Sequence, residues 1–339
     1  MKKLIGITIF LAILYGTLLQ ADPNAASAAN HKNLGQRIGK YGVLGLGAAL
    51  LIVTGGIDLS IGAVVGLCAT VGAMMVNGYL PGIVGRKLET LADGTVLETP
   101  IPNPQPIWLM ILAVLALGAF IGWLHGILVT KLKLQPFVVT LCGLFIYRGL
   151  ARWIAGDASQ GDVQNKPGYQ TFKNLLYRED VWVLPKFFVI FLVLLAVATV
   201  FLHFSVYGRY FFAIGSNETA ARYSGIATDR YKILAYVLCS TLAACGGLMY
   251  LAEFDSVVPS EAGNFFELYA IAAAVVGGFS LRGGEGTTPG LLIGTAILWL
   301  LPNLVNMWGV KSELNDTVIG GALLIGALID ELLRRRIRA

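Results

Sequence analysis

The sequence has little charge. Asp, Glu, Lys and Arg make up 13% of its 339 residues, about half of the share expected in a soluble domain. Hydrophobic residues make up 56%, and the mean hydropathy is +0.72. A soluble domain of this length cannot bury so much apolar surface, because the buried fraction rises only slowly with size. The composition excludes a disordered chain, a collagen and a nucleic-acid-binding domain, and it indicates a polytopic membrane protein.

Signatures of catalysis and nucleotide binding are also missing. The sequence contains no G-x-x-x-x-G-K-[ST] phosphate-binding loop, no H-E-x-x-H and no G-x-S-x-G. The glycine-rich run 283–288 lacks the lysine of such a loop, and it predicts a tight turn on the cytoplasmic side. We therefore expect no catalytic residue and no cofactor bound by this chain.

Histidine and cysteine are scarce, with three and four residues. None of them has the spacing of metal ligands, so we expect no metal site and interpret the cysteines as small core residues. His125 lies beside a glycine-rich stretch and is interpreted as a hydrogen-bonded core residue. The full set is His31, His125, His203, Cys68, Cys142, Cys239 and Cys245.

Apolar stretches of the length of a membrane span, about 20 residues, recur along the whole chain. We therefore predict an all-α fold, a polytopic bundle of about ten transmembrane helices that forms one domain over residues 1–339. The predicted spans are 4–20, 37–54, 59–77, 107–130, 136–155, 184–206, 232–252, 265–281, 289–306 and 315–333.

The basic residues predict the orientation, because Lys and Arg are enriched in cytoplasmic loops. With ten spans, the basic clusters all fall on one side, and the loops on the other side mix both signs of charge. Both termini are therefore predicted to be cytoplasmic, in a multi-pass protein of the inner or plasma membrane. The clusters contain Lys2, Lys3, Lys131, Lys133, Arg209, Arg222, Arg230, Lys232, Arg282 and the tail 334–338.

The first span has two interpretations. A short apolar run after two lysines, followed by Ala26-Ser27-Ala28, is typical of a signal peptide with an A-x-A cleavage site. The same run also fits a retained transmembrane helix, although it is short for one. Residue 30 lies outside in both cases, so the remaining topology does not change.

Two long loops fall on the outer side. Segment 78–106 is predicted to be an extracytoplasmic insertion, and its Asp-Gly pair at 93–94 lies between alternating apolar and polar residues, which indicates a β-hairpin. Four prolines at alternate positions from Pro100 to Pro106 then predict a stiff spacer. The second loop, 156–183, has no clear periodicity.

An apolar stretch is interrupted at Gly55 and Gly56. Asp58 then suits a helix cap, because its carboxylate can accept the free N–H groups of the next helix. The alternative is a broken helix that lines a translocation path through Gly55, Gly56, Asp58 and Ser60. Non-helical backbone at membrane depth is tolerated only inside protein or beside a water-filled cavity.

Charged side chains near the outer ends of two spans suggest contacts. Arg148 and Arg152 are one helical turn apart, and we expect them to reach lipid head groups or to pair with Glu253 or Glu267. The sharper hypothesis is that these four residues contact a substrate or a docking protein.

Small residues recur four positions apart, which places a groove on one helix face where a neighbouring helix packs closely. We interpret these positions as packing within the bundle. They are Gly62 and Gly66; Gly118, Gly122 and Gly126; Gly290 and Gly294; and Ala322 and Gly326.

The cytoplasmic segment 207–231 is suited to a partner. Ser216 or Asn217 fits an N-cap, Glu218 fits the first turn and Gly225 fits the position after the helix. The prediction is a helix of about two turns outside the membrane. Because such a short helix is marginal alone, it needs a surface, either its own bundle or a groove in a partner protein.

Several stretches together resemble the ribose-type membrane permeases of ABC importers, which are relatives of the branched-chain amino acid permeases. Each stretch is weak alone, but their order along nearly the whole chain is specific. The stretches are 55–62, 133–141, 148–150, 213–226, 267–281, 303–309 and Asp330.

The resemblance implies a permease subunit without its own ATPase. Cytoplasmic ABC ATPase subunits would bind ATP and contact this chain through a coupling helix at about 216–225. It also implies a second permease subunit, identical or different, and a periplasmic or extracellular sugar-binding protein. The residues assigned to ATPase coupling are Gly215, Ser216, Asn217, Glu218, Ala220, Ala221 and Gly225.

We expect a monosaccharide to be imported by alternating access. Two departures from the family pattern bear on the substrate: His125 stands where Asn is often seen, and Tyr269 stands where an acidic residue is common. The alternative function is a secondary carrier or channel driven by a gradient, but paired intramembrane charges and inverted repeats are not evident in the sequence.

Overall fold

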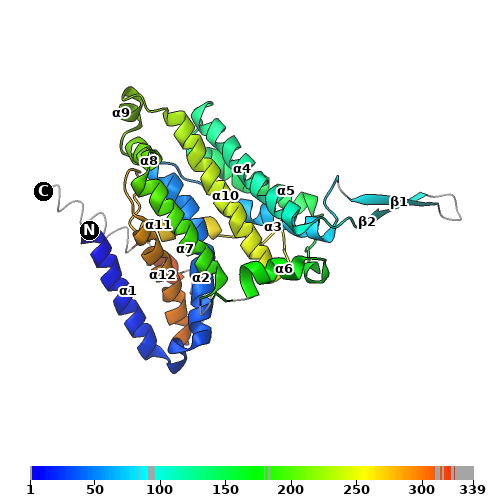
Figure 1. Ribbon diagram of the computed structural model, residues 1–339, viewed down its shortest axis with the longest axis horizontal. Coiled ribbons are helices and arrows are strands. Elements are labelled where there is room, and N and C mark those ends of the chain that lie inside the picture. The colour runs from blue at the N-terminus through cyan, green and yellow to red at the C-terminus, as the bar shows by residue number, and fades with distance from the viewer. Residues whose placement is uncertain are drawn as a thin grey trace. The chain divides into compact units, whose positions relative to one another are not determined.

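The computed structural model is helical over most of the chain and contains one two-stranded sheet (Figure 1). It describes residues 2–82, 84–90, 96–178, 180–181, 184–309, 314, 317–321 and 324. The tenth predicted span, 315–333, lies for the most part outside these residues. The sequence suggests no domain boundary, but contacts group the chain into two compact units. Unit 1 comprises Met1–Ile57, Asp180–Ala235 and Phe266–Ala339, and unit 2 comprises Asp58–Glu179 and Tyr236–Phe265.

Unit 1 is built around helix α2 (Ala28–Val53), which packs against α7, α11 and α12. Ser27, at the centre of the A-x-A pattern, is the N-cap of α2 and accepts a hydrogen bond from the Asn30 N–H. The other elements are α1 (Lys2–Ala21), η1 (Pro23–Ala26), α7 (Lys186–Thr199), the π-helical turn η4 (Val200–Phe204), α8 (Val206–Ser216), α9 (Glu218–Tyr223), α11 (Phe266–Val276) and α12 (Thr288–Met307).

Glycines on α2 let its neighbours approach the backbone. A Cβ on Gly39 would overlap the main chain of Phe187, and a Cβ on Gly42 would lie 2.6 Å from the Phe191 ring. The side of α2 that faces α7 therefore excludes larger residues at these two positions, as is common where membrane helices cross closely.

Unit 2 is built around α3 (Ile61–Asn77), which packs against α4 and α5. Its other elements are β1 (Gly85–Thr90), β2 (Val96–Ile101), α4 (Ile107–Thr130), α5 (Pro136–Ile154), η2 (Val163–Asn165), α6 (Tyr169–Lys173) and the π-helical turn η3 (Asn174–Arg178). Most of α10 (Thr228–Phe254) also belongs to unit 2, whereas its residues up to Ala235 belong to unit 1.

The four-residue spacing of small residues marks helix crossings, as predicted. A Cβ on Gly118 would lie 2.7 Å from the Ser240 carbonyl oxygen of α10, and a Cβ on Gly122 would lie 2.4 Å from the Tyr236 carbonyl oxygen. In unit 1, Gly290 and Gly294 meet the end of α11 in the same way. Ala322 and Gly326 lie outside the described residues.

Segment 78–106 contains a β-hairpin. Strands β1 and β2 pair antiparallel, from Gly85 opposite Ile101 to Thr90 opposite Val96. This is the pairing that the alternating pattern predicts, while the Asp-Gly pair at 93–94 lies outside the described residues.

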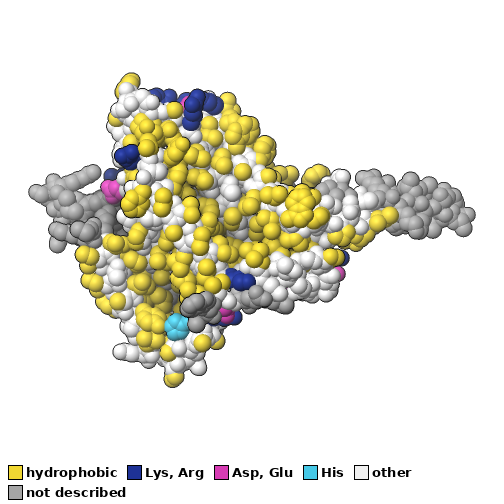
Figure 2. Space-filling model, viewed as in Figure 1, with side chains coloured by type: hydrophobic (Ala, Val, Ile, Leu, Met, Phe, Trp, Pro, Cys, Tyr) yellow, Lys and Arg dark blue, Asp and Glu magenta, His cyan; other side chains and the backbone are white. Residues whose placement is uncertain are grey.

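Six helices among the described residues have the length and hydropathy of a membrane span: Leu4–Ala21, Ile107–Thr130, Pro136–Ile154, Lys186–Phe204, Thr228–Phe254 and Thr288–Met307. Two shorter apolar helices, Ile61–Asn77 and Phe266–Val276, and helix α2 also coincide with predicted spans. Hydrophobic side chains cover most of the visible surface (Figure 2). Trp153 is 77% exposed and Phe204 is 80% exposed. Such an apolar exterior is expected where a helix bundle faces lipid.

Candidate functional site

Helix α9 begins at the second of the two N-caps that the sequence predicts. Asn217 is its N-cap, and the Asn217 Oδ1 atom accepts a hydrogen bond from the Ala220 N–H at 2.9 Å. This bond satisfies one of the N–H groups that every helix leaves free at its first turn. Glu218 follows in that first turn, where a carboxylate is favourable beside the positive end of the helix dipole.

The end of α9 is also confirmed. Gly225 has a φ of 84°, in the left-handed region that favours glycine. Its N–H donates to the Arg222 carbonyl at 3.0 Å, and the Ile226 N–H donates to the Ala221 carbonyl at 3.1 Å. These two bonds form a Schellman motif, which stops the helix after six residues.

Helix α8 was not predicted. The sequence places the end of a span at residue 206, but α7 ends at Thr199 and is followed by the π-helical turn η4. Ser205 then caps α8, because its Oγ accepts a hydrogen bond from the Gly208 N–H at 3.2 Å. The predicted span 184–206 agrees with the apolar helical stretch Lys186–Phe204, whereas α8 occupies the start of segment 207–231, where only the short coupling helix was predicted.

A network of charges ties α9 to the start of α10. Glu218 forms ion pairs with Lys232 and Arg222, and Arg222 also bonds Asp229 at 2.9 Å. Burial raises the pKa of Glu218, but the bonds to Lys232 and Arg222 outweigh this effect and leave its pKa below the ordinary 4.5. The network is therefore complete at neutral pH and weakens only when the pH falls through that lowered value.

The opposite side of α9 carries an exposed aromatic residue. Ala221 is buried, whereas Tyr223 is 89% exposed. Thr219 and Ala220 beside it are also exposed. Tyrosine is enriched among the residues that dominate binding energy in protein interfaces. This face of α9 therefore has the composition of a small docking surface.

Three chain segments of unit 1 meet at the end of α8, and we call this meeting point the glycine junction. A Cβ on Gly215 would overlap the Val53 carbonyl oxygen and the Gly284 nitrogen. The Gly284 N–H donates to the same Val53 oxygen at 2.9 Å. Gly283 has a φ of 86° and packs against Gly215. The segment that leads into α9 is thus locked, backbone against backbone, to the end of α2 and to the loop before α12.

The predicted break after α2 is present. Gly55 has a φ of 79°, and the Gly56 N–H donates to the Leu51 carbonyl at 3.2 Å. Together with a bond from Gly55 to Ile52 at 2.8 Å, this forms a second Schellman motif. The Gly-Gly pair therefore ends the helix.

Asp58 supports the start of α3 in a different way from a simple cap. The N-cap of α3 is Ser60, which makes no capping bond with its own side chain. Asp58 Oδ1 accepts hydrogen bonds from the Ser60 N–H at 2.7 Å and from the Ser60 hydroxyl at 2.6 Å. The carboxylate thus holds the N-cap residue instead of the first N–H groups within the helix.

Asp58 also belongs to a buried polar cluster in unit 2. Its Oδ2 atom lies 3.8 Å from His125 Nδ1 and 3.9 Å from Cys239 Sγ. His125 Nε2 forms a 2.9 Å hydrogen bond with the Tyr147 hydroxyl. The exposed fractions are 2% for Asp58 and 1% for His125. The interpretation of His125 as a hydrogen-bonded core residue is confirmed, and the sequence missed that it faces Asp58.

The two arginines of α5 have different surroundings. Arg148 donates to the Ala262 carbonyl, in the turn before α11, and its side chain is partly buried. Arg152 forms a bidentate pair with Asp157, with N–O distances of 2.8 and 2.7 Å. Arg152 therefore pairs with neither Glu253 nor Glu267.

The predicted acidic partners differ in burial. Glu267 is 8% exposed within α11 of unit 1, whereas Glu253 is half-buried near the end of α10 in unit 2. Cys142 also departs from expectation, because it is exposed on α5. In the described part of the chain, no three His, Cys, Asp or Glu side chains gather as metal ligands would.

The fold and this exposed helical segment define a multi-pass membrane protein with a surface suited to a partner. The chain belongs to the family of permease components of the branched-chain amino acid transport system, whose model matches residues 33–328.

Curated relatives cover nearly the whole chain. The ribose import permease protein RbsC of Escherichia coli K12 is 34% identical over 97% of this chain and 92% of its own length. The autoinducer 2 import system permease protein LsrC of Enterobacter sp. 638 is 34% identical over 96% and 86%. The galactose/methyl galactoside import permease protein MglC of Salmonella typhimurium LT2 is 31% identical over 96% and 94%. No solved structure matches the chain significantly.

Proposed function

We propose that the chain is the permease subunit of an ABC importer that moves a monosaccharide across the cell membrane. Family membership and full-length similarity to ribose and galactose import permeases support this function. The structural observation that carries it is α9: a short, capped helix, tied to the glycine junction, that presents an exposed tyrosine.

The proposed topology has about ten spans and cytoplasmic termini. The basic residues Arg209, Arg222, Arg230 and Lys232 all lie in or beside α8, α9 and the start of α10, which supports a cytoplasmic position for α9. The hairpin of 78–106 is then extracytoplasmic.

The proposed partners are two cytoplasmic ABC ATPase subunits, a second permease subunit and an extracytoplasmic sugar-binding protein. ATP is bound by the ATPase subunits, whose closure would move α9 and drive alternating access. Such coupling needs contacts that differ between the two states of the transporter. Gly55, Gly56, Asp58 and Ser60 remain proposed path residues. Arg148, Arg152, Glu253 and Glu267 remain proposed to contact the binding protein or the substrate.

We expect Gly225→Pro and Glu218→Lys to abolish ATP-driven uptake while the protein still folds into the membrane. Proline cannot adopt the positive φ of Gly225 and lacks the N–H that bonds Arg222. Lysine at position 218 would repel Lys232 and Arg222. The measurement is sugar uptake in proteoliposomes that contain the ATPase and the binding protein.

Two milder variants serve as controls for this experiment. Gly225→Ala keeps the N–H that bonds Arg222, and its Cβ would meet no atom within 4 Å, so only the positive φ is unfavourable. Glu218→Gln keeps a hydrogen-bond acceptor. Each of these variants should therefore retain more uptake than the disruptive variant at the same position. Normal transport by either disruptive variant would refute the coupling role. Uptake by the wild type without ATP would indicate a secondary carrier instead.

Tyr223→Ala should weaken the complex with the ATPase about tenfold or more without destabilising the permease, because an exposed aromatic side chain contributes to an interface and not to the core. The measurement is the affinity of the purified permease for the ATPase subunit. Tyr79→Ala is the control, since Tyr79 is exposed in the predicted extracytoplasmic insertion. Equal losses in both variants, or no loss in either, would contradict the role of Tyr223.

A further inference from the structure

The basic residues around α9 fall into two groups. Arg222 and Lys232 form ion pairs with acidic side chains. By contrast, the guanidinium groups of Arg209 and Arg230 form no ion pair or hydrogen bond within the described part of the chain, and both side chains are exposed. Figure 2 shows Lys and Arg side chains gathered where α8, α9 and the start of α10 lie in Figure 1. Two of these positive charges are therefore not neutralised by neighbouring side chains.

Three tyrosines lie beside these two arginines, and we call them the tyrosine cluster. They are Tyr207 and Tyr210 of α8 and Tyr231 in the first turn of α10. The centre of the Tyr231 ring lies 5.0 Å from that of Tyr210 and 6.2 Å from that of Tyr207. Each arginine immediately precedes one of the two tyrosines whose rings are 5.0 Å apart. The ring contact therefore also brings the two arginine positions close together.

The tyrosine cluster is accessible from the surface of unit 1. Tyr207 is 53% exposed, and the other two members are partly exposed. Helix α8 buries every third residue from 208 to 214, so one of its faces packs on the bundle and the rest of the helix faces outward. The ring of Phe201, near the end of the preceding membrane span, stacks on Tyr207 with centroids 6.1 Å apart. The cluster thus continues directly from that span.

An exposed apolar stripe leads along the same span towards the tyrosine cluster. Val193, Val197 and Val200 are between 58% and 62% exposed, and Phe204 is 80% exposed. Their spacing of three or four positions places them on one side of the helix. The span that contains them ends at Phe204, two residues before the start of α8. Such a stripe on a membrane span is expected to face lipid.

The chemistry along this surface changes in a fixed order, from aliphatic side chains to tyrosine rings to guanidinium groups. A phospholipid has the same order, from acyl chains through the glycerol esters to the phosphate. Tyrosine is enriched at the boundary between hydrocarbon and head groups, because its ring is apolar and its hydroxyl is polar. The continuity with a lipid-facing stripe favours a lipid over a soluble partner protein as the occupant.

The charges favour a head group with a net negative charge. Arginine is always protonated and can bind one phosphate through two parallel hydrogen bonds. The acidic residue that adjoins Arg230, Asp229, is already bound to Arg222. A choline head group has a cation of its own, which two unpaired arginines would repel. An anionic head group has no such cation.

We infer that Arg209, Arg230 and the tyrosine cluster bind the head group of an anionic phospholipid. In the proposed topology, this lipid belongs to the cytoplasmic leaflet. The bound lipid holds α8 at the membrane surface, together with the segment that leads into α9. This inference goes beyond the proposed function, because it depends neither on the transported substrate nor on the ATPase.

The experiment titrates the purified full-length chain in detergent micelles with phosphatidylglycerol and counts bound lipids by native mass spectrometry. Phosphatidylcholine lacks the net charge, and soluble glycerol 1-phosphate lacks the acyl chains. Arg209→Gln and Arg230→Gln each remove one charge, whereas Arg209→Lys keeps it. The matched control is Arg282→Gln, because Arg282 is also exposed, forms no ion pair within the described residues and adjoins no tyrosine.

We expect the wild type to bind phosphatidylglycerol saturably and about tenfold more tightly than phosphatidylcholine. Each glutamine variant of the site should weaken the first phosphatidylglycerol about fivefold, and Arg209→Lys and Arg282→Gln should change it less than about twofold. Thermal unfolding of all variants should match the wild type, since these side chains are exposed.

Four outcomes would overturn the inference. They are equal affinity for the two phospholipids, equal losses in Arg282→Gln and the site variants, unchanged phosphatidylglycerol binding in both site variants, and saturation by glycerol 1-phosphate at the same concentrations. The last result would assign the arginines to a soluble phosphate. Unchanged lipid binding together with weaker binding of the ATPase subunit would assign them to the partner protein instead.

Discussion

Gly215→Ala is expected to abolish ATP-driven uptake, although it adds only one methyl group. The new Cβ would overlap backbone atoms of Val53 and Gly284, and neither can rotate away as a side chain could. Overpacking of this kind costs about 1–3 kcal/mol. The added methyl group destabilises the packing at the glycine junction, so the segment that leads into α9 must move away from the end of α2. Uptake in proteoliposomes measures the loss.

Gly149→Ala is the matched control, because a Cβ at this helical position of α5 meets no atom within 4 Å. It should transport normally and is expected to be slightly more stable, since alanine favours a helix by about 1 kcal/mol over glycine. The purified Gly215→Ala protein should retain its helical content, because the core of unit 1 lies elsewhere along α2. Wild-type uptake by Gly215→Ala would show that the junction is not part of coupling.

Asp58→Ala is expected to destabilise the protein by about 2–4 kcal/mol, because it leaves the Ser60 N–H and hydroxyl without their acceptor in a buried site. Asp58→Asn retains an oxygen in the same position and should cost clearly less. The thermal unfolding of both purified variants, compared with the wild type, measures the difference.

Transport by the asparagine variant distinguishes the two interpretations of Asp58. A folded but inactive Asp58→Asn protein would assign the carboxylate to the translocation path. A folded and active one would assign it to support of the α3 N-terminus. Ser60→Ala is a useful comparison, since it removes the hydroxyl bond and leaves the backbone bond intact. An Asp58→Ala protein as stable as the wild type would contradict the structural role altogether.

Local features were predicted well from the sequence. The bounds of α4 agree with the predicted span at 107–130, α9 begins after Asn217, one of the two predicted N-caps, and Gly225 follows it as predicted. The span and the helix caps each depend on interactions between residues that are a few positions apart, so the local sequence is enough to predict them. The same reasoning missed α8, because it predicted only the short coupling helix in segment 207–231.

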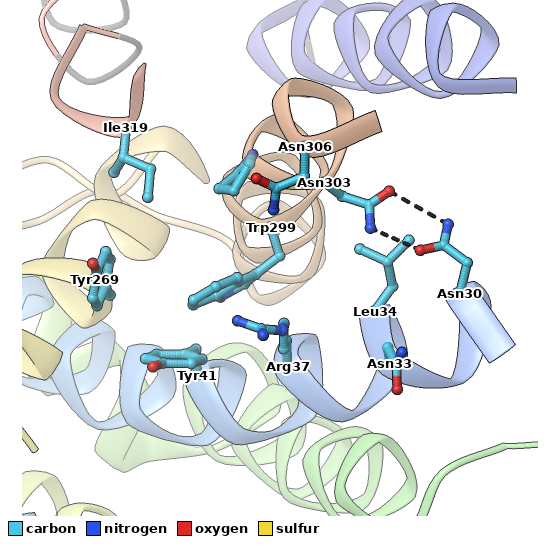
Figure 3. A pocket seen from close by; sticks show the side chains of 11 residues that line it. Asn30, Asn33, Leu34, Arg37, Tyr41, Tyr269, Trp299, Asn303, Asn306 and Ile319 are labelled. Carbon is cyan, nitrogen blue, oxygen red and sulfur yellow. Dashed lines mark hydrogen bonds between the residues drawn. The ribbon is translucent and has the colours of Figure 1, made fainter. Parts of the chain in front are cut away.

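The sequence by itself predicted a membrane helix bundle, a break at the Gly55-Gly56 pair and a short capped helix at about 216–225. Only the tertiary structure decided that Gly215 meets Val53 and Gly284, that Asp58 faces His125, and that the rings of Tyr41, Tyr269 and Trp299 pack together (Figure 3). The physical reason is the range of the forces involved. Hydropathy and capping act between neighbours in the chain, whereas these contacts join residues tens to hundreds of positions apart that come together only when the helices pack.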